Sequence, residues 1–160
     1  VGKSPLPKFT LGLTNTFNMG KFDLNIFING MFGHYIYNNT SNALFTSGSL
    51  GNGRNVTQEV VGNGESRANS ADASTRFLEK GDFVRLQNLT LGYNIPITSQ
   101  YLSSVRLYLN AQNLLTFTSY SGQDPEVDTN KSIDDVPSAG IDYVSYPRAR
   151  TITFGANVNF

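Results

Sequence analysis

Apolar and polar residues alternate strictly through the last eleven residues, RTITFGANVNF. Ile152, Phe154, Ala156, Val158 and Phe160 share one parity, and the residues between them are Thr, Gly and Asn. Successive side chains of an extended strand point to opposite faces, so this pattern gives one apolar and one polar face. The alternation recurs upstream, whereas helical spacing is scarce. The sequence therefore predicts an all-β chain of antiparallel strands.

Five strands are expected, at residues 9–19, 22–35, 82–95, 104–118 and 150–160. In the third strand the phase of the apolar residues changes at Gln87, with Val84 and Leu86 before it and Leu89 and Leu91 after it. A phase change of this kind predicts a β-bulge at that position. The strands run to about 11–15 residues, well beyond the usual length of about 5–6 in globular proteins.

The connections between these strands alternate between short and long. In chain order they are Gly20–Lys21, residues 38–80, residues 96–103 and residues 119–147. Long strands of period two, joined by alternately short and long connections, are typical of transmembrane β-barrels, whose strands need about 9–11 residues to cross the bilayer. With Phe160 at the periplasmic rim, both long connections become extracellular loops and both short ones become periplasmic turns. The sequence predicts an antiparallel segment of such a barrel, with a C-terminus at the periplasmic rim.

Strict alternation has a physical reason in lipid. Every backbone polar group must then bond to a neighbouring strand, while one side-chain face meets hydrocarbon and the other meets the lumen. The chain also stops on an aromatic residue, with apolar residues at every second position before it. Phe154, Val158 and Phe160 resemble the C-terminal signal by which outer-membrane proteins are recognised for insertion.

Composition excludes several classes of protein. The chain has 160 residues, with 12 Lys and Arg against 12 Asp and Glu, and no cluster of basic residues, which argues against a nucleic-acid partner. It has no Cys, so disulfides and thiolate metal sites are excluded. No apolar run approaches the roughly 18 residues of a membrane-spanning helix, and no signal peptide is recognisable at Val1, as expected of a mature domain or a fragment.

A soluble, secreted β-sandwich that binds carbohydrate is the alternative, because its strands also alternate apolar and polar residues. Strand length and the asymmetry of the connections favour the barrel.

The residues give no support for an enzyme or a cofactor. His34 is the single His, and no nucleophile motif accompanies it, so we expect it to lie at the rim of the second strand. The stretch from Asp124 to Asp135 has acidic residues at alternate positions, yet Thr129 stands where a calcium-binding EF-hand loop needs Gly. We expect a solvated acidic loop, and calcium binding stays open.

Three stretches carry a family resemblance: FLEKGDFVRLQNLTLGYNIP (residues 77–96), VRLYLNAQNLLTFTSYSGQDPEV (residues 105–127) and GIDYVSYPRARTITFGANVNF (residues 140–160). Together they resemble the C-terminal region of SusC/RagA-type TonB-linked outer-membrane proteins. Residues 1–76 match that family only in pattern.

The resemblance implies an integral protein of the Gram-negative outer membrane that imports oligosaccharides or peptides. Members of the family are barrels of about 22 strands with an N-terminal plug in the lumen. A SusD-like surface lipoprotein covers the extracellular face as a lid, and TonB engages an N-terminal segment. The 160 residues are then expected to supply barrel wall and two extracellular loops, without the plug or the TonB-contacting segment.

The resemblance also suggests contacts for the second long connection. Candidate residues for contact with a partner or a substrate are Tyr120, Asp124, Glu126, Tyr143 and Tyr146. The rings of the three Tyr residues could stack on sugars, contact the lid or belong to the aromatic girdle at the membrane interface. The girdle or contact with the lid is favoured over direct contact with substrate. Outer-membrane lipid and lipopolysaccharide are expected to surround the strands. Near the extracellular rim, Arg148 and Arg150 are candidates for contact with lipopolysaccharide phosphates or with the aqueous boundary.

Overall fold

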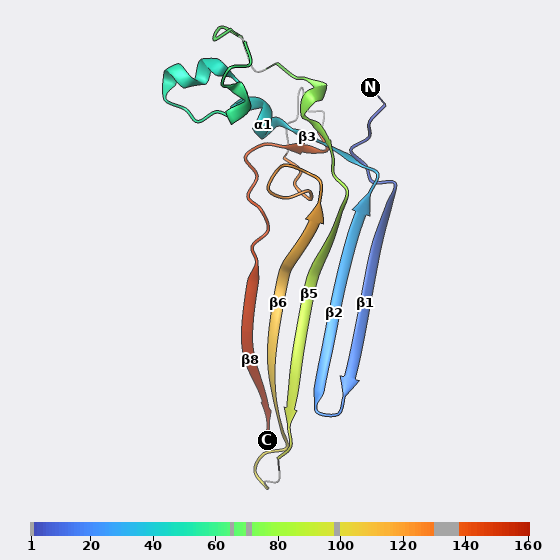
Figure 1. Ribbon diagram of the computed structural model, residues 1–160. Coiled ribbons are helices and arrows are strands. Elements are labelled where there is room, and N and C mark those ends of the chain that lie inside the picture. The colour runs from blue at the N-terminus through green and yellow to red at the C-terminus, as the bar shows by residue number, and fades with distance from the viewer. Residues whose placement is uncertain (1, 65, 70–71, 98–99, 130–137) are drawn as a thin grey trace. The chain divides into compact units, whose positions relative to one another are not determined.

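The computed structural model describes residues 2–64, 66–69, 72–97, 100–129 and 138–160 (Figure 1). The chain forms two compact units. The sheet unit comprises residues 9–32, 83–118 and 148–160, and the loop unit comprises residues 1–8, 33–82 and 119–147.

The sheet unit is a single antiparallel sheet in the order β1-β2-β5-β6-β8. Its strands are β1 (Phe9–Met19), β2 (Phe22–Phe32), β5 (Phe83–Ile95), β6 (Ser104–Thr118) and β8 (Thr151–Asn159). The bounds of β1 and β6 coincide with those expected from alternation. β5 begins one residue later than expected, and β8 is one residue shorter than expected at each end.

The second strand is shorter than expected. β2 ends at Phe32 instead of Tyr35, because Gly33 has a φ of 82° and turns the chain out of the extended conformation. His34 follows the bend at Gly33 and is buried, so it does not end a strand as the sequence suggests. Tyr35 begins a separate strand of the loop unit.

The turn between β1 and β2 is as tight as predicted. Met19 lies directly opposite Phe22, so only Gly20 and Lys21 connect the two strands. Gly20 has a φ of 61°, the left-handed conformation that two-residue hairpin turns require.

The predicted β-bulge is confirmed. Leu89 lies opposite Ile26 and Leu86 lies opposite Ile28, so β5 uses one residue more than β2 over this interval. The extra residue is Gln87. It brings Leu86 back to the same face as Leu89, which keeps that face of the sheet apolar on both sides of the bulge.

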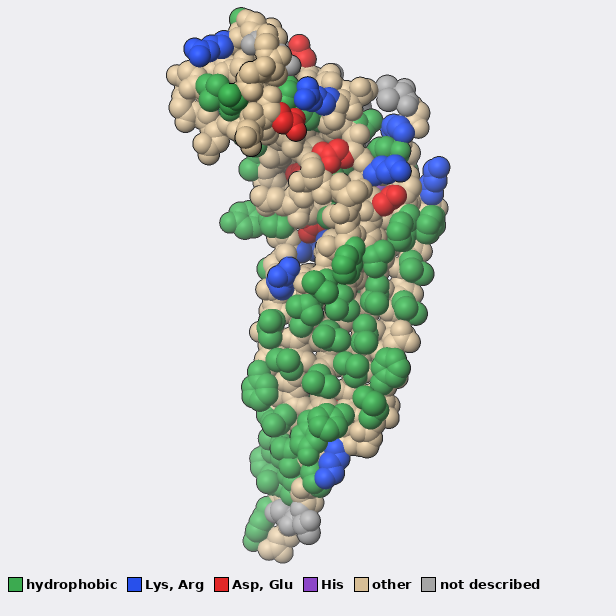
Figure 2. Space-filling view, viewed as in Figure 1, with side chains coloured by type: hydrophobic (Ala, Val, Ile, Leu, Met, Phe, Trp, Pro, Cys, Tyr) green, Lys and Arg blue, Asp and Glu red, His purple; other side chains and the backbone are tan. Residues whose placement is uncertain are grey.

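The two faces of the sheet unit differ in chemistry. Figure 2 shows apolar side chains gathered over these strands, and many are strongly exposed, with Phe117 at 66% and Phe154 at 72%. On the opposite parity polar side chains pair across strands. Asn110 donates hydrogen bonds of 2.7 Å to both Asn88 and Thr90. The sheet therefore has one wet face and one face that water would solvate poorly.

The loop unit contains regular structure that alternation does not predict, because its elements are too short to display a period. Three strands form a second sheet in the order β4-β3-β7, with β3–β4 antiparallel and β3–β7 parallel. They are β3 (Tyr35–Asn38), β4 (Leu78–Lys80) and β7 (Ile141–Asp142). One short helix, α1 (Asn39–Leu44), and three 3-10 turns, Ser47–Asn52, Gln58–Val60 and Thr75–Phe77, lie between β3 and β4.

A small apolar core holds the loop unit together. Phe45, Val60 and Phe77 are buried, and Tyr37 and Val56 pack against them. The rings of Phe45 and Phe77 meet edge to face with centroids 5.5 Å apart. This arrangement is favourable for aromatic pairs.

Asn38 caps the N-terminus of helix α1, and its side-chain oxygen accepts a hydrogen bond of 2.9 Å from the amide of Ser41. Within the described ranges, no helix has the length and apolar character needed to cross a membrane.

Candidate functional site

A polar network joins the two long connections inside the loop unit. Glu79 on β4 accepts hydrogen bonds from the Ser121 amide at 2.8 Å, from the Ser121 hydroxyl at 2.7 Å and from the Asn38 amide group at 3.0 Å. Asn38 is only 1% exposed. Because hydrogen bonds to an ionised group are stronger than neutral ones, Glu79 fixes the start of the second long connection against β3.

A second buried pair stands beside this network. The Tyr120 hydroxyl donates a hydrogen bond of 2.7 Å to Oδ2 of Asp142, and both residues are 5% exposed. Burial, and then the hydrogen bond to the carboxylate, raise the pKa of Tyr120. Tyr120 therefore stays protonated and acts as a fixed donor that orients Asp142.

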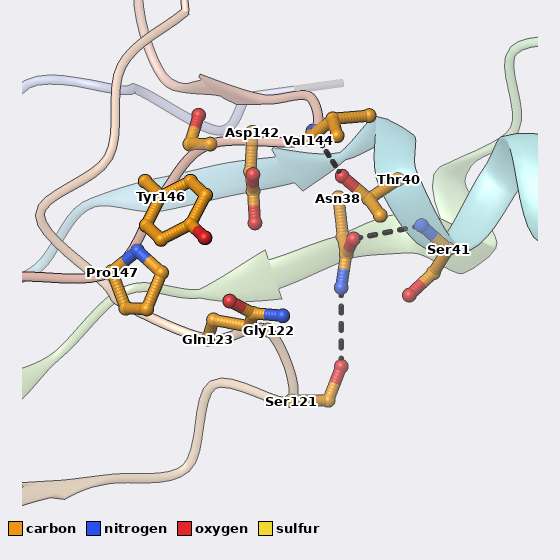
Figure 3. Close-up of a pocket in the computed structure, with 11 residues that line it drawn as sticks. Asn38, Thr40, Ser41, Ser121, Gly122, Gln123, Asp142, Val144, Tyr146 and Pro147 are labelled. Atoms are coloured by element: carbon orange, nitrogen blue, oxygen red, sulfur yellow. Dashed lines mark hydrogen bonds between the residues drawn. The ribbon is translucent and has the colours of Figure 1, made fainter.

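Asp142 opens onto a pocket of about 480 Å³ (Figure 3). The pocket is lined by residues from three segments of the loop unit, 38–41, 121–123 and 142–147. In Figure 3 the side chains of Asp142, Tyr146 and Gln123 project toward the same space. The lining combines apolar surface with hydroxyl and amide groups, and none of the described lining residues is Lys or Arg.

The segment after β7 is held in an unusual conformation at the pocket rim. Val144 has a φ of 53°, which is an outlier for a β-branched residue. Its amide donates a hydrogen bond of 2.7 Å to the Thr40 hydroxyl, drawn in Figure 3, which ties the segment to α1. Two residues later the Tyr146 ring is 96% exposed. Backbone strain of this kind concentrates at functional sites.

The five residues predicted as contacts all lie in the loop unit, in different environments. Tyr120 and Asp124 are buried, Glu126 is half-buried, and Tyr143 and Tyr146 are exposed at 37% and 96%. Asp124 accepts a hydrogen bond of 2.9 Å from the Glu126 amide, as a local turn does. Among the five, only Tyr146 lines this pocket.

The pocket also contains residues that sequence patterns do not identify. Asn38, Thr40, Gln123 and Asp142 belong to no motif, and as many as 104 residues separate hydrogen-bonded partners at the rim. No local signal predicts such a site, because tertiary contacts assemble it: the pairing of β3 with β7 and the hydrogen bonds of Ser121 to Glu79.

The acidic stretch is described only in part. Asp124 to Thr129 belong to the described residues, whereas residues 130–135 lie outside them. Within the part of the chain that the structure describes, no group of three or more His, Asp or Glu side chains could hold a metal ion.

The sheet unit has a charged site of its own. Arg106 on β6 donates to Asp23 on β2, with Nε–Oδ1 at 3.0 Å, across the intervening strand β5. The pair passes over Gly92, where an added Cβ would lie 2.4 Å from both side chains. Gly at this position therefore makes room for an ion pair that ties three strands together.

The residues of the predicted insertion signal lie at the end of the sheet unit. Phe154 and Val158 are on β8, opposite Leu109 and Val105 of β6, and Phe160 follows the strand. Their side chains are exposed at 72%, 44% and 89%.

Comparison with known proteins gives a consistent assignment, although no family model matches the chain. It is 36% identical to the TonB-dependent receptor P3 of Formosa agariphila, over 98% of this chain and 17% of that protein. It is 31% identical to the TonB-dependent receptor SusC of Bacteroides thetaiotaomicron, over 99% of this chain and 16% of that protein. The chain thus spans less than a fifth of the length of these relatives.

Solved structures agree with the sequence relatives. A structure of the RagAB peptide importer in the open-open state superposes with a TM-score of 0.77 at 25% identity, covering all of this chain and 18% of that chain. A structure of the RagAB peptide transporter gives a TM-score of 0.74 at 24% identity, with the same coverage.

The antiparallel sheet matches part of a RagA barrel, which defines the class as β-barrel membrane proteins. The chain belongs to the SusC/RagA-type TonB-dependent receptors and matches a segment of them. TonB-dependent receptors are outer-membrane proteins of Gram-negative bacteria, and the family consists of transporters, not enzymes.

Proposed function

We propose that the chain supplies part of the wall and two extracellular loops of an outer-membrane importer of oligosaccharides or peptides. The observation that carries the proposal is the sheet unit, a set of long strands with one exposed apolar face and one hydrogen-bonded polar face. Such a sheet suits a wall that has lipid on one side and a wet lumen on the other.

The direction of the chain supports a sided arrangement. Both long connections leave the sheet at the same end. β2 ends there at Phe32, β5 begins there at Phe83, and β6 ends there at Thr118. The turn at Gly20–Lys21 lies at the other end. We assign the end with the long connections to the extracellular side, and the hairpin end with Phe160 to the periplasmic rim. Phe154, Val158 and Phe160 then form the insertion signal.

The partners follow from the relatives. The RagAB structures are described as a peptide transporter and a peptide importer, and the curated relatives are described as TonB-dependent. By analogy, the importer works with a SusD-like surface lipoprotein as a lid and takes energy from TonB through a region outside these 160 residues. Membrane lipid and lipopolysaccharide surround the wall.

Labelling of introduced cysteines in the whole receptor tests the sidedness, since these 160 residues contain no Cys. Val61→Cys places a thiol on an exposed site of the loop unit, and Lys21→Cys places one in the hairpin turn. A polyethylene-glycol maleimide too large for porins should label Val61→Cys on intact cells. It should label Lys21→Cys only after the outer membrane is permeabilised.

The reverse labelling pattern would contradict the proposed sidedness. Labelling of both sites in a soluble fraction would contradict membrane insertion altogether. Import is tested on the same cells, because uptake by this receptor should stop when TonB is deleted.

A further inference from the structure

We propose that the pocket of the loop unit binds a neutral saccharide, with Tyr146 stacking on a sugar ring and Asp142 accepting hydrogen bonds from its hydroxyls. The inference rests on the proposed importer function, and it specifies the ligand class at one surface of that importer.

Charge selects against acidic ligands. The Asp142 carboxylate lines the pocket, and none of the described lining residues is basic. A uronic acid, a sulfated sugar or a peptide C-terminus would place a second negative charge in the pocket without a cation to balance it, and like charges at close range are unfavourable. A neutral ligand avoids this repulsion.

The pocket offers hydrogen-bonding capacity that the described residues leave unused. Oδ2 of Asp142 accepts from Tyr120, whereas its Oδ1 receives no hydrogen bond from any described residue. The side-chain amide of Gln123, on the facing segment, likewise has no partner among the described residues. A carboxylate oxygen accepts hydrogen bonds and an amide both donates and accepts, so together they match the adjacent hydroxyls of a sugar.

An aromatic ring stands beside these polar groups. Tyr146 is 96% exposed at the rim, and its segment is tied to α1 by the hydrogen bond from Val144 to Thr40. The C–H face of a sugar ring is apolar enough to pack on an aromatic face. The combination of an open ring with hydroxyl-binding groups fits a saccharide better than it fits a charged amino group, which would use Asp142 alone.

The size of the pocket suits a short segment of a saccharide. Its volume of about 480 Å³ lies within the range of about 300–1,000 Å³ typical of small-molecule sites. Tyr120 acts here as a positioning residue, because it holds the Asp142 carboxylate and does not itself line the pocket.

The test uses the whole receptor purified in detergent and isothermal titration calorimetry. The neutral probes are cellohexaose, laminarihexaose and mannohexaose, and the comparison ligands are a guluronate hexamer and pentaalanine. At least one neutral probe should bind, and neither comparison ligand should bind in a manner that depends on Tyr146. Tyr146→Ala should weaken that binding by about tenfold, which corresponds to about 1.4 kcal/mol.

Two further variants separate a binding role from a structural one. Gln123→Ala removes an exposed amide without a partner among the described residues, and it should weaken binding by about threefold, as expected for one neutral hydrogen bond. Tyr101→Ala removes an exposed Tyr from the connection between β5 and β6, and it should leave affinity unchanged.

Equal affinity of the wild type and Tyr146→Ala would overturn the inference. So would a failure of all three neutral probes to bind, or Tyr146-dependent binding of pentaalanine or of the guluronate hexamer. TonB-dependent uptake of a neutral probe that is insensitive to Tyr146→Ala would overturn the pocket inference and leave the importer function standing. Absence of any TonB-dependent uptake, together with reversed cysteine labelling, would instead count against the importer itself.

Discussion

The sheet unit and the loop unit belong to one chain, but they place their apolar side chains differently. The loop unit buries Phe45, Val60 and Phe77 in a core and exposes polar loops, as a small soluble domain does. The sheet unit leaves many of its apolar side chains exposed and pairs polar side chains with one another. The difference teaches that the loop unit carries its own apolar core, whereas the sheet unit needs lipid or neighbouring strands against its apolar face.

The comparison predicts that core damage in the loop unit stays local. Phe77→Ala should destabilise the loop unit by about 3–4 kcal/mol, the range for removing a buried aromatic ring. Faster proteolysis of the loop unit in the whole receptor would report the loss, while the heat-modified mobility of the folded barrel in gel electrophoresis stays unchanged. Val61→Ala, at a site 72% exposed, is the control and should have little effect. Loss of the barrel's heat-modified mobility in Phe77→Ala would show that the two units are not independent.

Introducing a charge on either face of one strand tests whether lipid covers the apolar face of the sheet unit. Leu13 and Thr14 are neighbours on β1 that point to opposite faces. Leu13→Arg places a charge on the apolar face and should destabilise the receptor by about 2–3 kcal/mol if that face meets lipid, whereas Thr14→Arg should be nearly neutral. The fraction of folded receptor in outer-membrane extracts, measured over a urea titration, separates the two variants. Equal effects would remove the argument that lipid covers this face.

The ion pair on the polar face should contribute less. Asp23 and Arg106 are partly exposed, with side chains at 22% and 29%, so their attraction is screened by water. Asp23→Asn and Arg106→Met should each reduce stability by about 1 kcal/mol or less. A double-mutant cycle checks whether the two losses are coupled, and strict additivity would show that the pair contributes nothing as a pair.

The smallest effect concerns alkaline pH and the loop unit alone. The pKa of Tyr120 is raised from 10.0 in the fold, so the folded loop unit holds this proton more tightly than the unfolded chain does. The stabilisation is complete below the unfolded pKa and is lost as the pH rises beyond it. Hydrogen exchange of the loop unit should therefore accelerate above pH about 10, and Tyr120→Phe should show a weaker acceleration. An identical pH profile in both proteins would argue against the buried pair with Asp142.

Sequence patterns predicted the sheet unit far better than the loop unit. Alternation is a local property that repeats over 9 to 15 residues of each strand, and even the bulge at Gln87 appears as a change of phase. The strands of the loop unit have 2 to 4 residues, too few to display any period. Gly33, with its positive φ, marks the place where β2 ends and the loop unit resumes.

The pocket escaped prediction for a related reason. Among the residues proposed as contacts, Tyr146 could be picked because an aromatic residue in a polar loop stands out. No sequence pattern distinguishes Asp142 or Gln123, since their roles depend on which segments the fold brings together. The burial of Tyr120 against Asp142 likewise follows from a tertiary hydrogen bond that no spacing encodes.

The parallel pairing of β3 with β7 has a consequence for the order of folding. Tyr37 and Asn38 pair with Ile141 and Asp142, and the chain between them includes all of β5 and β6. Contacts of such high sequence separation form slowly, because a long loop must close before they gain any energy. Residues 33–82 hold the aromatic core and can collapse early, whereas the pocket closes only when segments about 100 residues apart have met. We therefore expect the pocket to form later than the aromatic core of the loop unit.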